Sequence, residues 1–284
     1  WYGEIHALKG ISLNVEKNGV VSLLGANGAG KTTTMRMLLG LTQPTSGEVQ
    51  IFGKTLVNNE KTILPRIGSL IESPGFYQNL TATENLKIFA DLRGLKKAGC
   101  IKEALNLVNL PYGDKKLFSQ YSLGMKQRLA IALAIMHNPQ VLILDEPING
   151  LDPIGIAEVR SFIRELCDSY GKTIIISSHI LSEISLLADD IGIIDRGVLL
   201  EEESLKELEE KNAKYIHFIT SNAKKAAQVI ESLFQTKNVK ITDEYNLYLY
   251  DTVLPVAKIN RTLIESGIDI KELHLCEETL EDYF

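Results

Sequence analysis

The sequence predicts an α/β fold, and three observations lead to that prediction. The apolar, β-branched run Val20–Leu24 is followed by a glycine-rich segment, Gly25–Thr32, and then by a helical pattern. Beyond residue 141, short apolar strands alternate with helices, as is typical of a parallel sheet with helices on its faces. Residues 215–275 follow the order β-α-β-β-α-β, which indicates a small ferredoxin-like α+β domain.

Composition restricts the class of protein. The 284 residues suit two domains or one large α/β unit, and 45% hydrophobic with 23% charged residues is typical of a soluble globular protein. The net charge of −6 gives no electrostatic footprint for nucleic acid, so we expect no nucleic-acid partner. The cysteines show no metal or disulfide spacing and predict reduced thiols in the cytosol: Cys100, Cys167 and Cys276.

Membrane and secretion signals are not expected in this sequence. Its long apolar runs, such as Leu129–Met136, fall well short of the roughly 20 residues that a membrane span needs. No secretory signal opens the sequence. Because the sequence does not begin with Met, we expect native residues to precede Trp1.

The first part of the chain is expected to be strand-rich and the next part helical. Strand-like pieces occur within residues 8–15, 20–24 and 48–53, with one helix after the glycine-rich segment, and we expect an antiparallel β subdomain. From about residue 65 the spacing becomes helical, with helices over 85–92 and 101–108 and a third that begins at Ser122. We place a helical subdomain at about residues 73–137.

The remaining elements complete the sheet and then a second domain. Strands are expected at Val141–Leu144, Thr173–Ser177 and Ile191–Ile194, with a helix between the first two. A charged helix over residues 204–211 reads as a connector, so we place the domains at 1–210 and 211–284. In the second domain we expect strands at 215–219, 239–242, 246–250 and 270–275, and helices at 223–233 and 256–266. A structural or dimer-stabilising role for this domain is at least as plausible as a regulatory one.

The glycine-rich segment, GANGAGKT, has the chemistry of a phosphate-binding loop. Gly25, Gly28 and Gly30 allow a tight wrap with backbone N–H groups pointing inward, and the following helix adds its unpaired donors and positive dipole end. Lys31 would reach the β- and γ-phosphates, and Thr32 would place its hydroxyl on Mg²⁺. The alternative is a glycine-rich turn without a ligand.

Two carboxylates end the apolar strand that begins at Val141. Asp145 fits a partner of the Mg²⁺ held by Thr32, and Glu146 fits a general base that polarises the attacking water. Carboxylates at strand ends also occur as plain helix caps. His179 follows the strand that ends at Ser177, so it opens at the same edge and is expected to contact the γ-phosphate, although a lone histidine is usually structural.

Another anion site is suggested by YSLGMKQR, residues 121–128. Ser122 is a good N-cap residue, and a helix start beside Gly124 offers unpaired N–H groups. From the residues alone, a cap on a buried apolar helix is the better explanation of this segment.

These motifs occur in the order found in the nucleotide-binding subunits of ABC transporters, and residues 1 to about 210 resemble that family of P-loop NTPases. GANGAGKT resembles the Walker A motif, and LILDEP resembles Walker B with catalytic Glu146. YSLGM stands where the family has its LSGGQ signature, NGLD (residues 149–152) resembles the D-loop, and His179 the switch histidine. Tyr2 falls where the family stacks an aromatic ring on adenine.

The resemblance implies a head-to-tail homodimer that closes on two ATP molecules with Mg²⁺, each site completed by Ser122 and Gly124 of the other copy. It implies Glu146, His179 and Lys31 as catalytic residues and Thr32, Asp145 and Glu72 as metal-site residues. Glu72 stands where most relatives have a glutamine, and Leu123 and Met125 replace a glycine and a glutamine. The nucleotide contacts implied are Tyr2, Gly25, Asn27, Gly28, Ala29, Gly30, Lys31, Thr32, Thr33, Ser122, Gly124 and Asp152.

Three longer segments are similar to ATPases of lantibiotic self-protection and bacitracin resistance: IESPGFYQNLTATENL, YSLGMKQRL and ISSHILSEI. The chain's last six residues, TLEDYF, are also similar to that group's ending. This similarity implies an ATPase subunit that works with integral-membrane permease subunits, peripheral on the inner face of the cell membrane, and expels peptide antibiotics. The alternatives are an exporter of lipid, drug or other small cargo, a soluble ABC ATPase acting on ribosomes or DNA, and a module that binds ATP without cleaving it. Phe76 and Tyr77 either face the permease or belong to the core.

Overall fold

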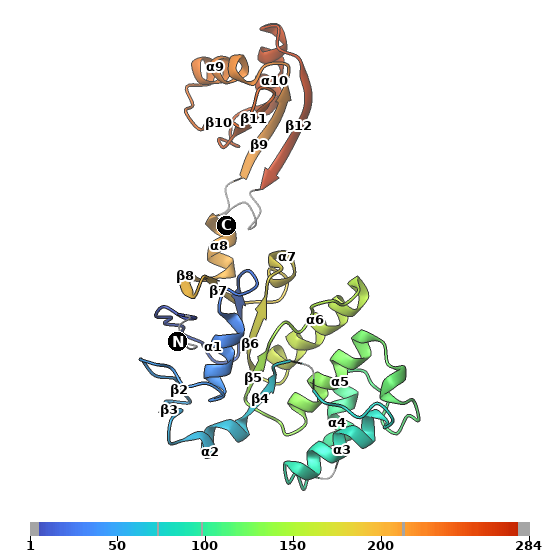
Figure 1. Cartoon of the computed structure of the whole chain (residues 1–284). Coiled ribbons are helices and arrows are strands. Elements are labelled where there is room, and N and C mark those ends of the chain that lie inside the picture. Colours follow the sequence, from blue (N-terminus) through green and yellow to red (C-terminus); the bar gives the residue numbers. More distant parts are fainter. Residues whose placement is uncertain (1–5, 73, 98, 212–213, 278–284) are drawn as a thin grey trace. The chain divides into compact units, whose positions relative to one another are not determined.

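The computed structural model describes residues 6–72, 74–97, 99–211 and 214–277, and the chain forms two compact units, Trp1–Leu205 and Lys206–Phe284 (Figure 1). The division falls at the start of helix α8 (Leu205–Lys211), whereas the boundary proposed from the sequence placed that helix in the first domain. Tyr2 and the ending TLEDYF lie outside the described residues.

A six-stranded sheet organises the larger unit, in the order β4-β5-β6-β1-β7-β8. The strands from β4 through β7 run parallel, and β8 pairs antiparallel with β7 at one edge. The carboxyl ends of parallel strands meet at one edge of a sheet, so the residues that follow β1, β5 and β6 converge there. The strand bounds are β1 Val20–Leu24, β4 Ile67–Leu70, β5 Val141–Leu144, β6 Thr173–Ser178, β7 Asp190–Asp195 and β8 Val198–Ser204.

Helices α3 to α5 form an insertion between β4 and β5. Helix α5 is buried all round from Leu129 to Ile135, as its run of apolar residues predicts. A two-stranded antiparallel hairpin lies earlier in the chain, at β2 (Gln50–Ile51) and β3 (Lys54–Thr55). The helices of this unit are α1 Lys31–Leu38, α2 Glu60–Ile63, α3 Ala82–Leu92, α4 Cys100–Leu107, α5 Leu123–Ile135, α6 Pro153–Asp168 and α7 Leu181–Ile184, with 3₁₀ turns at Leu64–Arg66 and Phe118–Gln120.

Strands β4 and β8 were not expected from the sequence. Gly68 interrupts the apolar pattern of β4, and its missing side chain is required because a Cβ there would lie 2.1 Å from the carbonyl oxygen of Ala134. Strand β8 contains the acidic run Glu201–Glu203, which hides its strand pattern, and it forms an edge of the sheet.

The strand-like alternation at residues 8–15 does not form a strand. Within the described residues 6–19 the backbone is irregular, yet Ile11, Leu13 and Val15 pack against the buried core. Alternating apolar residues here indicate burial on one side, without the hydrogen-bond ladder that defines a strand.

The smaller unit has the predicted order of strands and helices. Its sheet runs β10-β11-β9-β12, and every neighbouring pair is antiparallel. Helices α9 (Ala223–Phe234) and α10 (Val256–Glu265) bury residues such as Ile230 and Leu263 in a core with Phe218. The strands are β9 Lys214–Thr220, β10 Val239–Ile241, β11 Asn246–Leu249 and β12 Ile270–Glu277. None of the helices in the described ranges has the length and apolar character needed to cross a membrane.

Candidate functional site

The loop between β1 and α1 strongly favours glycine at two of its positions. A Cβ at Gly25 would lie 2.2 Å from the carbonyl oxygen of Ile194. Gly30 has φ +116°, which side chains rarely adopt, and its Cβ would lie 2.6 Å from Cδ2 of Leu8. Between them, residues 26–28 are exposed. The loop therefore presents its backbone to solvent while its two ends are pressed against the protein.

Helix α1 begins with free donors. Its N-cap residue is Gly30, and no side chain among the described residues caps its first turn. The unpaired N–H groups and the positive dipole end therefore remain available to an anion. Lys31, which is 6% exposed, curls back along the loop and its Nζ donates to the carbonyl oxygens of Gly25, at 2.6 Å, and Ala26, at 3.3 Å.

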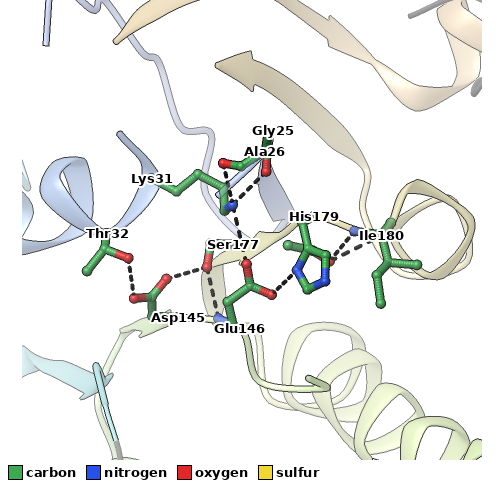
Figure 2. Close-up of polar contacts among 10 residues, drawn as sticks. Gly25, Ala26, Lys31, Thr32, Asp145, Glu146, Ser177, His179 and Ile180 are labelled. Atoms are coloured by element: carbon green, nitrogen blue, oxygen red, sulfur yellow. Dashed lines mark hydrogen bonds and ion pairs between the residues drawn. The ribbon is translucent and has the colours of Figure 1, made fainter. Parts of the chain in front are cut away.

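Asp145 directly follows β5, and its carboxylate accepts hydrogen bonds from hydroxyl groups on two other elements (Figure 2). The Thr32 hydroxyl donates to Asp145 Oδ2 at 2.8 Å, and the Ser177 hydroxyl donates to Asp145 Oδ1. The Asp145 N–H donates to the carbonyl of Leu70 on β4, at 2.8 Å, which fixes the backbone. A carboxylate beside a threonine hydroxyl is a set of hard oxygen ligands that suits a small divalent cation such as Mg²⁺.

Glu146 turns away from the strand direction and meets two basic side chains. Its φ of +49° is uncommon for a residue with a side chain, and such strain is typical of functional sites. The Glu146 carboxylate lies 3.3 Å from Lys31 Nζ through Oε1 and 2.9 Å from His179 Nδ1 through Oε2. The structure thus brings together the three residues that the sequence analysis named as catalytic.

Ser177 is a site residue that the sequence analysis missed. It is fully buried, donates to Asp145, and accepts a 2.8 Å hydrogen bond from the Glu146 N–H. One side chain thereby holds both carboxylate residues in place. The sequence shows only that the aliphatic strand β6 ends in two serines, and their meaning becomes visible once β5, which the two acids follow, is paired beside β6.

The other residues of the loop and of α1 take less specific positions. Asn27 is exposed at the tip, Ala29 is buried, and Thr33 is half-buried in the first turn of α1. The carbonyl oxygen of Ala29 accepts a hydrogen bond from the Gly197 N–H at 2.8 Å, which ties the loop to the β7–β8 turn.

Ser122, Gly124 and Asp152 lie apart from this cluster. Across the described part of the chain, no hydrogen bond or ion pair links them to residues 25–33. Ser122 caps α5 by accepting from the Met125 N–H at 3.3 Å, and Asp152 caps α6 by accepting from the Gly155 N–H at 2.9 Å. Within one chain Ser122 and Asp152 act as helix caps and Gly124 lies in the first turn of α5, and the role of all three towards nucleotide stays a prediction.

Glu72 forms an ion pair with Arg36, one helical turn beyond Thr32 on α1. Its side chain is 71% exposed and its φ is +64°. The sequence left open whether Phe76 and Tyr77 belong to the core or lie on the surface, and the structure gives a different answer for each. Phe76 is buried against Phe89 and Phe118, whereas Tyr77 is 54% exposed.

Fold and site together define a P-loop nucleoside-triphosphate hydrolase, with a phosphate-binding loop, a strand-end acid pair and a histidine at one sheet edge. The family model described as ABC transporter matches residues 8–149. The chain is 47% identical to the bacitracin transport ATP-binding protein BcrA of Bacillus licheniformis over 100% of this chain and 92% of that protein. It is 47% identical to the lantibiotic transport ATP-binding protein SrtF of Streptococcus pyogenes, covering 71% of this chain and 86% of that protein.

A solved structure supports the same assignment. A dimeric ATP-binding cassette in a post-hydrolysis state bound to ADP and Pi matches with TM-score 0.63 and 27% identity, covering 71% of this chain and 91% of that one. The protein belongs to the ABC transporter ATP-binding family. It is an ATP-binding protein and an ATPase.

Proposed function

We propose that this protein is the ATP-hydrolysing subunit of an exporter that expels peptide antibiotics of the bacitracin or lantibiotic type from the membrane, for self-protection or resistance. The proposal that the cargo is a peptide antibiotic rests on the similarity to a bacitracin transport protein along the whole chain. Integral-membrane permease subunits are its proposed partners, at the inner face of the cell membrane. Exposed Tyr77, beside the helical insertion, is the residue we propose to face them.

ATP is the substrate, and the loop at Gly25–Thr32 is its proposed phosphate site. The unpaired N–H groups at the start of α1 suit the β- and γ-phosphates, and the Lys31 ammonium lies beside the loop carbonyls. The Thr32 hydroxyl and the Asp145 carboxylate fit Mg²⁺, with Glu72 as the further proposed ligand. Bound there, the ion would neutralise charge on the phosphates.

Glu146 is the proposed general base. Its carboxylate accepts a proton from the attacking water. His179, whose Nδ1 lies 2.9 Å from Glu146 Oε2, orients that carboxylate. Lys31 also contacts Glu146, so arrival of a γ-phosphate would draw the Lys31 ammonium towards the phosphate and release the carboxylate for water. Lys31 and His179 then stabilise the charge that develops on the transferring phosphoryl group.

A second copy of the chain is proposed to complete each site. Ser122 and Gly124 lie at the start of helix α5, and no hydrogen bond among the described residues joins them to the loop at Gly25–Thr32. Ser122 is exposed and Gly124 is half-buried, and this helix start carries N–H groups suited to phosphate. Head-to-tail pairing of two copies would bring Ser122, Gly124 and Asp152 of one copy to the nucleotide of the other.

Peptide sensitivity tests the cargo. Cells that lack this chain are compared with cells that regain the wild type or Glu146→Gln, in growth against bacitracin, a lantibiotic and an unrelated drug. The proposal expects increased sensitivity to the peptides alone, restored by the wild type and not by Glu146→Gln. Unchanged peptide sensitivity, or sensitivity to the unrelated drug only, would point to another cargo.

A further inference from the structure

Arg93 follows the last turn of α3 and reaches across to the end of α5. Its Nη1 lies 3.1 Å from the carbonyl oxygen of Leu133 and 3.0 Å from Nδ1 of His137. A cation at the C-terminal end of a helix also meets the negative end of the helix dipole. Although Arg93 as a residue is exposed, its guanidinium group is desolvated, and this burial lowers the pKa of Arg93.

The hydrogen bonds of His137 determine its tautomer. Its Nε2 lies 3.0 Å from the carbonyl oxygen of Ile67, the first residue of β4, and a carbonyl can only accept. Nε2 therefore carries the hydrogen, and the lone pair of Nδ1 accepts from Arg93. The neutral ring thus joins the end of α3 to the start of β4 and uses both of its nitrogens.

The same helix is fastened at its other end by Asn85, which is fully buried. The Asn85 side chain accepts from the Tyr77 N–H and donates to the carbonyls of Tyr77, Leu80 and Thr81. Helix α3 therefore connects the loop of exposed Tyr77 with the base of β4. At that base, α5 already packs closely on β4 at Gly68.

We propose that Arg93 and His137 form a proton-sensitive joint that positions the helical insertion relative to the sheet, and that it transmits the position of the Tyr77 loop to the ATP site. The second part rests on the proposed function, because it assumes a permease at Tyr77. The first part concerns the larger unit alone. Neither residue touches the proposed nucleotide site, so both are positioning residues.

Protonation is expected to open the joint. A charged ring would place an N–H against the guanidinium of Arg93, which turns an attractive contact into a meeting of two donors and two positive charges. The charged groups acting on the ring are Arg93 from α3 and Lys172, which precedes β6; from β4 the ring meets the Ile67 carbonyl. Burial lowers the pKa of His137 most, the Ile67 contact opposes this, and the two cations lower it further.

Distances between spin labels test the joint without a transporter. Labels on Lys87→Cys in α3 and Ser161→Cys in α6, with Cys276 changed to Ser, report how the insertion sits against the sheet. The wild type is compared with Arg93→Met, His137→Gln and the double variant, at about pH 8 and about pH 5. Lys96→Met, which removes an exposed cation of the same loop, is the matched control. His137→Asn keeps an acceptor near the Nδ1 position and is the conservative variant.

One narrow distance distribution is expected for the wild type, Lys96→Met and His137→Asn at high pH. A second, displaced population is expected in Arg93→Met and His137→Gln at both pH values, with no further change in the double variant. In the wild type that population should appear only at low pH. A single unchanged distribution in every folded variant at both pH values would overturn the proposal, and circular dichroism identifies the variants that have folded.

Activity of the isolated and the permease-bound protein separates the two parts of the proposal. Arg93→Met and His137→Gln should keep the KM for ATP, and they should lose stimulation by the permease by about fivefold or more, the size of an ordinary coupling effect. Displaced labels with normal stimulation would refute transmission and leave the joint intact. A wild type without any stimulation by membrane subunits would count against the proposed function, while the label distances would still decide the joint.

Discussion

Helices α1 and α5 both begin at positions proposed to meet phosphate, but their first turns differ. Helix α1 starts after Gly30, in a left-handed conformation, and no side chain of the described residues caps it. Helix α5 starts after Ser122, whose hydroxyl accepts a hydrogen bond from the N–H of Met125, the third residue of the helix. The first start leaves its donors to a ligand, and the second satisfies one of its own. The α1 start, which keeps its N–H groups for a ligand, thus depends on the backbone conformation of glycine. The α5 start is capped by its own serine, so it needs no ligand for stability and can still offer a contact to a second copy.

The largest expected effect lies at the acid beside the α1 start. Glu146→Gln should lower steady-state hydrolysis by roughly 10² to 10⁴-fold, because it removes the general base but keeps the side chain's shape. ATP binding should persist, and the nucleotide-bound dimer should accumulate. Phosphate release and size-exclusion chromatography with ATP measure the two effects. Turnover at the wild-type rate would show that Glu146 is not the base.

Matched glycine substitutions compare the two helix starts directly. Gly30→Ala should cost about 1–3 kcal/mol, because the residue has φ +116° and its Cβ would meet Leu8. Gly124→Ala should change the free energy of unfolding by less than about 1 kcal/mol, because within the described residues an added Cβ would meet nothing within 4 Å beyond its chain neighbours and the backbone of its own helix. Urea unfolding of the isolated proteins provides both values. Equal costs would remove the contrast between the two helices.

Ser122 can be tested by a variant that keeps the cap and changes the charge. Ser122→Asp caps a helix as well as serine does, so stability should change by less than about 0.5 kcal/mol. Its carboxylate would repel the phosphate of the other copy, and the loss of one hydrogen bond to a charged group alone predicts about tenfold weaker dimerisation with ATP. Ser122→Thr, which keeps both cap and hydroxyl, is the control. Normal dimerisation of Ser122→Asp would leave Ser122 as a cap only.

The smallest effect is expected at Glu72. Glu72→Ala removes an ion pair with Arg36 in which the two side chains are 71% and 38% exposed, and such pairs contribute about 0–1 kcal/mol. Nucleotide binding should stay nearly intact, while export driven by the permease should weaken. Nucleotide titration and export in cells measure the two quantities. Unchanged export would remove Glu72 from the coupling between ATP and transport.

The sequence predicted the elements whose pattern is local. Strands β1 and β5 have the bounds expected from their β-branched runs, and the acids after β5 were placed at the correct sheet edge. The order of the smaller unit was also predicted, because each strand and helix has its own period. In these places local pattern and tertiary packing agree.

The features that were missed depend on neighbours distant in the chain. Gly68 interrupts the apolar pattern of β4 in the sequence. The position needs glycine because the carbonyl oxygen of Ala134 leaves no room for a Cβ. Ser177 looks like an ordinary strand residue until β5 is placed beside β6. Residues 8–15 alternate because one side packs on the core, yet they pair with no strand within the described residues. Tertiary contact decides each of these cases, and a single sequence does not display it.

A crystal structure of Glu146→Gln with ATP and Mg²⁺ tests the central claim most directly. The account predicts a triphosphate in the loop at Gly25–Thr32, a metal ion at Thr32 and Asp145, and Ser122 of a second copy on the γ-phosphate. An empty loop, or an Asp145 side chain turned away from the metal ion, would contradict it.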